Sequence, residues 1–188
     1  MRKTLPKRAV LVPEDAERVF QGIIYDTYHW EQELYDGTKA TFEMLKRPDT
    51  VKVIAIDNDN IIVLEQEQPN QGLFYDIPGG IHDHEEEDEL AAVKRELLEE
   101  TGMTFSNWKL VNVVQPHNKI EQFVYTFIAT GLANQRKQQL DAGERIKMKH
   151  VSLDEAKILL TPPKGRFMPK EIEKALDIKG LLDLPEYN

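Results

Sequence analysis

The chain has 188 residues, with 24 basic and 33 acidic side chains, a net charge of −9 and no cysteine. The length fits one domain, and the lack of cysteine excludes disulfides, thiolate catalysis and zinc–thiolate sites. The negative charge argues against non-specific binding to nucleic acid or membranes.

The first half of the chain has the pattern of strands. Residues 19–30 predict N-terminal strands, and the turn dipeptide Asp36-Gly37 predicts a reversal. A second hairpin joins residues 51–56 to 61–64 through 57–60. Residues 74–77 form a strand that leads into a Pro-Gly-Gly turn.

A helix with an apolar face follows this turn and ends at Gly102, where a residue with positive φ is wanted. Further strands are expected at 108–114, 121–130 and 145–151. Ser152 then caps a helix that ends at Pro162-Pro163, and residues 169–182 predict one last helix.

Three glutamates crowd one side of the first helix. Glu96, Glu99 and Glu100 stand at i, i+3 and i+4, and such like charges repel by a few tenths of a kcal/mol per pair unless a cation lies among them. Hard carboxylate oxygens favour Mg²⁺ or Mn²⁺ over zinc, and Mg²⁺ suggests phosphate chemistry. A solvated acidic helix face is the alternative, and the neighbouring glycines and arginine argue against it.

The stretch from Gly80 to Gly102 resembles the Nudix box, the signature of hydrolases that cleave nucleoside diphosphates linked to another group. Arg95-Glu96, Glu99-Glu100 and Gly102 fall in its register. The first glycine is displaced by one residue, which we interpret as an insertion in the acidic loop. The glutamate expected in that loop is therefore either Glu86 or Glu87.

The resemblance implies an α/β fold, a Nudix-type α/β/α sandwich with a mixed sheet over residues 51–188. An N-terminal antiparallel strand region, residues 1–50, precedes it. Residues 19–42 and 51–69, together with Gln115-Pro116, resemble the ADP-ribose pyrophosphatase branch. In that branch the N-terminal sheet exchanges between two protomers, which implies a homodimer acting on a small-molecule nucleoside diphosphate derivative.

One departure from this branch concerns the segment after Glu65-Gln66. The branch usually has an aromatic residue and an arginine there, whereas this chain has Glu67 and Gln68. Other nucleotide sugars therefore stay open beside ADP-ribose. A nucleoside triphosphate pyrophosphatase and a catalytically silent ligand sensor are the two alternative functions.

The expected mechanism is metal-assisted hydrolysis of a pyrophosphate bond. Arg95 should orient a neighbouring carboxylate, and the general base should be Glu144, then Asp141, then a carboxylate of the box. We expect the metal ligands to come from Glu96, Glu100 and the backbone of Gly80. Glu99 should be either a further ligand or a catalytic residue that orients the ligands. Substrate contacts should come from Gln68, Tyr75, His117 and Glu121.

The location in the cell follows from the apolar segments. The apolar run after the basic N-terminus spans only residues 9–12, which is too short for a signal peptide, and no run approaches membrane-spanning length. We therefore expect a cytoplasmic protein.

Overall fold

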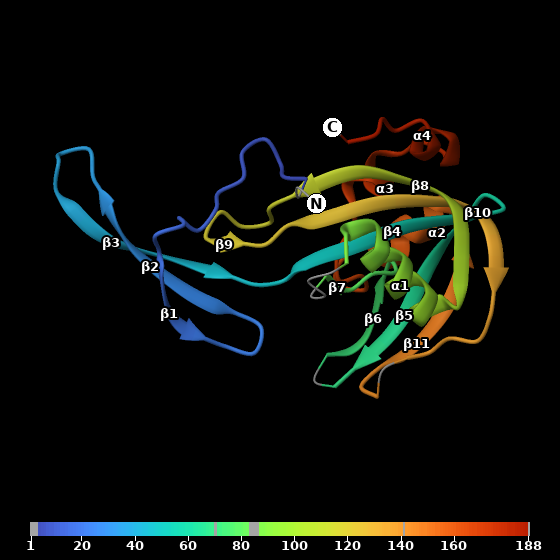
Figure 1. Cartoon of the computed structure of the whole chain (residues 1–188). Coiled ribbons are helices and arrows are strands. Elements are labelled where there is room, and N and C mark those ends of the chain that lie inside the picture. Colours follow the sequence, from blue (N-terminus) through green and yellow to red (C-terminus); the bar gives the residue numbers. More distant parts are fainter. Residues whose placement is uncertain (1–3, 70, 83–86, 141, 188) are drawn as a thin grey trace.

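The computed structural model describes residues 4–69, 71–82, 87–140 and 142–187, and it contains a core and a projecting arm (Figure 1). The core is built on a mixed sheet with the strand order β11-β5-β4-β10-β8; β6 pairs with β5, and β7 pairs with β4. The bounds of these strands are β4 Asp49–Asp57, β5 Asn60–Gln68, β6 Gly72–Asp76, β7 Ile81–His82, β8 Met103–Val114, β10 Val124–Gln135 and β11 Arg145–Val151.

Helices cover both faces of this sheet. On one face, α1 (Glu89–Thr101) buries Ala92, Val93 and Leu97 against alternate residues of the central strands. On the other, α2 (Leu153–Leu160), α3 (Lys170–Lys174) and α4 (Ile178–Leu182) pack on a second apolar cluster. The predicted α/β/α sandwich is confirmed, and β4 and β10 are the parallel pair that makes the sheet mixed.

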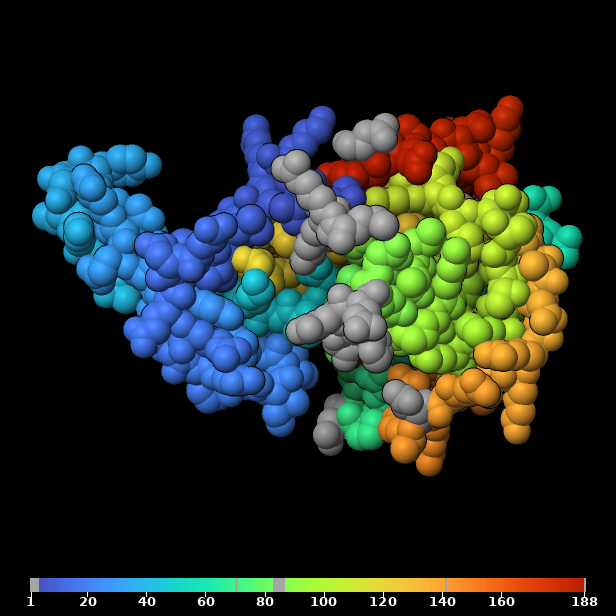
Figure 2. All heavy atoms as spheres, in the orientation of Figure 1, coloured from blue at the N-terminus to red at the C-terminus, as the bar shows by residue number. Residues whose placement is uncertain are grey.

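The arm is a second sheet formed by the N-terminal strands. It has the order β1-β2-β3-β9, with β1 (Glu17–Gln21), β2 (Asp26–Glu33) and β3 (Lys39–Lys46) antiparallel as expected. The two-residue strand β9 (Ile120–Glu121) joins it in parallel and was not predicted. Figure 2 shows the arm extending away from the core. The division into residues 1–50 and 51–188 stays a prediction.

Local signals explain where the helices begin and end. The side chain of Asp88 accepts a hydrogen bond from the Ala91 amide at 2.7 Å, which caps α1, and the Gly102 amide closes it at positive φ. The prediction of a single helix over residues 169–182 was wrong. The backbone at Ala175 is extended, so α3 ends there, and Asp177 caps α4 as a separate helix.

In the part of the chain that the structure describes, none of the helices has the length and apolar character needed to traverse a bilayer.

Candidate active site

The turn after β6 lies directly on the carboxylates of α1. The Gly79 amide donates to the Glu100 carboxylate at 2.7 Å, and the Val51 amide donates to the Gly80 carbonyl at 3.0 Å. At Gly80, a Cβ atom would lie 2.4 Å from the carboxyl carbon of Glu96. The glycine backbone therefore brings β4, the turn and the helix together without a side chain between them.

Arg95 connects the carboxylates to one another. Its Nη1 donates to Glu96 at 2.8 Å and to Glu99 at 3.2 Å, and its Nε donates to Glu87 at 3.3 Å. The Ile81 carbonyl accepts from Nη2 at 3.3 Å. These contacts bring Arg95 to the carboxylates that it was predicted to orient, and the role itself stays a prediction. They also identify Glu87 as a loop partner of the helix, while Glu86 lies outside the described residues.

Burial makes it costly to keep the carboxylates of Glu96 and Glu100 ionised. The side chain of Glu96 is 15% exposed, and Glu100 is 5% exposed. Burial raises the pKa of Glu96, opposed by Arg95 and reinforced by the charges of Glu99 and Glu144. Burial also raises the pKa of Glu100 well above its usual range, and Lys52 and the Gly79 amide oppose that shift.

Glu144 reaches this cluster from a distant part of the sequence. It stands just before β11 and is half-buried. Its charge contributes to the raised pKa of both Glu96 and Glu100, so the fold brings Glu144 within electrostatic range of both carboxylates. Its role as the base stays a prediction. Asp141, the second candidate for the base, lies outside the described residues.

Lys52 was missed by the sequence reasoning. Its ammonium donates to Asp76 at 2.7 Å and to the Ile77 carbonyl at 3.4 Å, which fixes a positive charge near Glu100. A signal was available, because Lys52 is the only charged residue in the otherwise apolar segment 51–56. A lone lysine in a buried strand indicates a buried anionic partner.

The donor set fits a hard divalent cation. Its members are carboxylates, and Arg95 is the cation that bonds to several of them while Lys52 is engaged by Asp76. Excess negative charge of this kind is what Mg²⁺ or Mn²⁺ neutralises. Within the described ranges, no group of three or more His, Asp or Glu is already gathered closely enough to hold an ion. Arg95 holds the outer carboxylates in the present arrangement.

Two of the predicted substrate residues are engaged elsewhere. Tyr75 packs on the face of the sheet that carries α2 and donates to Glu65 at 3.0 Å, so it does not meet the α1 carboxylates. Glu121 is buried at the junction of arm and core. Its carboxylate accepts from Lys46 at 2.7 Å and from the Val12 amide at 2.6 Å.

The other two predicted substrate residues are more accessible. His117 is exposed in the loop before β9, where its Nδ1 accepts from the Lys119 amide at 3.1 Å. Gln68 ends β5 and accepts a hydrogen bond from Arg166 at 3.2 Å. Neither residue has a described bond to the α1 carboxylates, so their substrate contacts stay predictions.

Comparisons with known proteins agree with this geometry. The family model described as the NUDIX domain matches residues 46–170. An ADP-ribose pyrophosphatase of Bacillus subtilis (strain 168) is 32% identical over 146 residues, covering 74% of this chain and 77% of the relative. A methanol dehydrogenase activator of Bacillus methanolicus is 28% identical over 144 residues, with the same coverage of both chains.

A solved structure shares the fold. The crystal structure of an ADP compounds hydrolase superposes with a TM-score of 0.66 at 19% identity, covering 96% of this chain and 94% of that one.

Proposed function

We propose that this chain, which belongs to the Nudix family of pyrophosphate hydrolases, cleaves ADP-ribose or another nucleotide sugar with Mg²⁺ as the cofactor. The observation that supports this most is the contact of the glycine turn with the buried carboxylates of Glu96 and Glu100. The B. subtilis relative is an ADP-ribose pyrophosphatase, which favours this substrate class over nucleoside triphosphates.

The proposed ligands are Glu96 and Glu100, with Glu99 and the Gly80 carbonyl beside them. These residues would hold Mg²⁺, or Mn²⁺ in its place, and the ion would supply neutralisation of the phosphate oxygens and a lower pKa for an attacking water. Arg95 donates to the carboxylates of Glu96 and Glu99 and so fixes their orientation. The backbone amide of Gly79 fixes the rotamer of Glu100.

Glu144 is proposed to remove the proton from the attacking water. This proposal is supported by the effect of its charge on Glu96 and Glu100, the proposed metal ligands. The water oxygen bonds to one phosphorus while the bond from that phosphorus to the bridging oxygen breaks. ADP-ribose would then give AMP and ribose 5-phosphate. Asp141 and a carboxylate of the box follow as second and third candidates for this base.

The test separates products from a panel of ADP-ribose, other nucleotide sugars, dinucleoside polyphosphates and nucleoside triphosphates by ion-exchange chromatography with Mg²⁺. Glu100→Gln should lower turnover at least a hundredfold, since one anionic ligand is lost, while the amide oxygen keeps the bond from Gly79. Glu155→Gln in α2 is the matched control, with unchanged turnover.

Three results would contradict the proposal. Equal rates for Glu100→Gln and the unaltered protein would refute the metal site. Hydrolysis of triphosphates alone would move the enzyme to the sanitising type, and binding without hydrolysis would support the ligand sensor.

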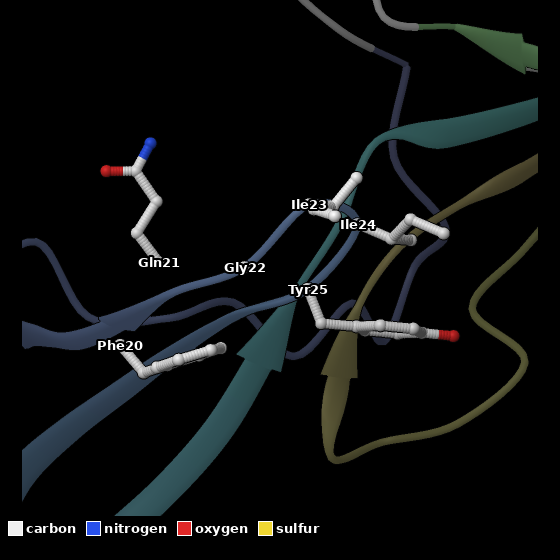
Figure 3. A pocket seen from close by; sticks show the side chains of 6 residues that line it. All are labelled: Phe20, Gln21, Gly22, Ile23, Ile24 and Tyr25. Carbon is white, nitrogen blue, oxygen red and sulfur yellow. The ribbon is translucent and has the colours of Figure 1, made fainter.

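We also propose a homodimer formed through the arm. The turn between β1 and β2 exposes Phe20, Ile23, Ile24 and Tyr25 around a hollow of about 720 Å³ (Figure 3). Ile23 is fully exposed, and a cluster of apolar side chains on a projecting element is typical of a protein interface. Light scattering should give twice the chain mass, and Ile23→Asp should halve it. A monomeric unaltered protein would refute the dimer.

A further inference from the structure

An arginine stacked on an aromatic ring lies at the edge of the core sheet. The guanidinium carbon of Arg166 is 4.6 Å from the ring centroid of Phe74. Phe74 is buried, whereas Arg166 is exposed. We propose that this pair is the platform on which the nucleobase of the substrate stacks. The inference rests on the proposed function.

The backbone holds Arg166 in this place. The segment after α2 runs along β6, where the Tyr75 amide donates to the Lys164 carbonyl at 2.9 Å. The Arg166 amide in turn donates to the Tyr75 carbonyl at 2.9 Å, and Gly165 forms a parallel bridge with Tyr75. The segment thus extends the sheet by one short edge, and the direction of Arg166 is set before any ligand binds.

The platform lies on the face of the sheet that carries the active-site helix. Phe74 pairs with Gln66, and Gln66 pairs with Ile146. Ile146 belongs to the apolar cluster that packs on α1. Residues paired across a sheet share a face, so Phe74 and the guanidinium stacked on it share the face of α1.

Spacing along β6 separates this platform from the carboxylates. The Arg166 guanidinium bonds to Gln68 and Gln71, which lie at the start of β6, where Gln68 pairs with Gly72. The glycine turn that contacts Glu96 and Glu100 follows the other end of this strand, after Asp76. A pyrophosphate held beside Glu96 therefore lies at the opposite end of β6 from the Arg166 guanidinium. ADP-ribose has no third anionic group, so the recognisable group that remains for this position is its planar nucleobase.

The chemistry of the platform suits a base. The Arg166 guanidinium donates to the side-chain oxygens of Gln68, at 3.2 Å, and of Gln71. Both partners are neutral, so these bonds orient the guanidinium without cancelling its charge. A planar guanidinium stacks on aromatic faces, and the two glutamine amides can bond to the polar edge of a base that lies on it.

The test is to compare Arg166→Gln with the unaltered protein. KM for ADP-ribose should rise about tenfold, the effect of losing one stacking contact, while kcat stays within about twofold because the reacting atoms are distant. In titration calorimetry AMP should bind about tenfold more weakly, and ribose 5-phosphate should bind as before. Lys147→Gln, an exposed cation on the opposite face, is the matched control and should behave as the unaltered protein.

Failure of this inference can be told from failure of the proposed function. If the unaltered protein leaves ADP-ribose intact, the proposed substrate is wrong, and the AMP titration still decides the platform. Equal AMP affinity in Arg166→Gln and the unaltered protein would overturn the inference. Equal losses for AMP and ribose 5-phosphate, or no AMP binding by the unaltered protein, would overturn it as well.

Discussion

Alanine substitutions at the two glycines of the turn after β6 should have different effects, one on stability and the other on catalysis. At Gly79 the φ angle is +143°, and a Cβ atom would lie 2.1 Å from the Val51 carbonyl oxygen. At Gly80 the obstacle is the carboxylate of Glu96, at 2.4 Å. Backbone of a central strand cannot move aside, whereas the end of a glutamate can rotate away.

These obstacles set the expected magnitudes. For Gly79→Ala, strain at a φ that favours glycine and overpacking each cost about 1–3 kcal/mol. A combined loss of about 4 kcal/mol would lower Tm by roughly 8–16 °C in a chain of this length. For Gly80→Ala, we expect a loss below about 1 kcal/mol. Its kcat should nevertheless fall about a hundredfold, since a misplacement near 1 Å of a reacting group has that effect.

The assay measures two properties of each variant. Circular dichroism against temperature gives Tm, and formation of AMP from ADP-ribose with Mg²⁺ gives kcat. The matched pair is informative because the two substitutions are identical and adjacent. A Gly80→Ala variant with full kcat would refute the placement of Glu96 under the turn. A Gly79→Ala variant with unchanged Tm would refute the close approach to β4.

Three further substitutions test separate contacts. Lys52→Met should lower the free energy of unfolding by about 3 kcal/mol in urea titrations, because it leaves buried Asp76 without its cation; a loss below about 1 kcal/mol would contradict this ion pair. Asp88→Ala should cost about 1 kcal/mol in the same titration, since the cap of α1 is lost. Arg95→Lys should lower kcat roughly tenfold or more, because an ammonium cannot hold several carboxylates as the planar fork does; unchanged kcat would refute the orienting role.

Local signals made much of the fold predictable. The strand 145–151 was predicted with the bounds that the structure has, and the helix after Ser152 begins where it was predicted and ends at Leu160, just before Pro162-Pro163. These predictions succeeded because the alternation and the cap lie within a few residues of each other. The strand expected from residue 108 begins earlier, at Met103. The cause is that β8 follows directly on Gly102, and the polar residues after it hide the pattern of a strand paired with β10.

Contacts between residues far apart in the chain could not be predicted from the sequence. Glu121 was expected to contact substrate because it lies five residues after Pro116, in a segment that resembles the substrate loop of the ADP-ribose pyrophosphatase branch. Its neighbours in space, Lys46 and the Val12 amide, come from the arm and from the N-terminal segment. A two-residue strand is too short to show a periodic pattern, so the sequence does not predict that β9 pairs with β3. Contacts of this kind depend on the tertiary fold, which spacing along the chain does not contain.

The site itself was predictable to the extent that one helix carries it. The i, i+3, i+4 spacing brings Glu96, Glu99 and Glu100 together in any α-helix, and Arg95 reaches Glu99 for the same reason, since it stands four residues before it. The cation that acts on this cluster from outside the helix could not be predicted from helical spacing. Lys52 comes from β4, and it lies near Glu100 only because β4 also holds the glycine turn through Val51.

The contacts of Arg95 and Lys52 also bear on how a chain of net charge −9 can bind an anionic substrate. The fixed cations at the carboxylates, Arg95 and Lys52, are both engaged by glutamate or aspartate, so neither offers a free charge to a phosphate. Attraction at the reacting end must therefore come from a bound divalent ion. Arg166, whose amide partners leave its charge intact, acts at the other end. Removing the ion with a chelator should thus abolish AMP formation and leave AMP binding dependent on Arg166; loss of both together would refute this division of the site.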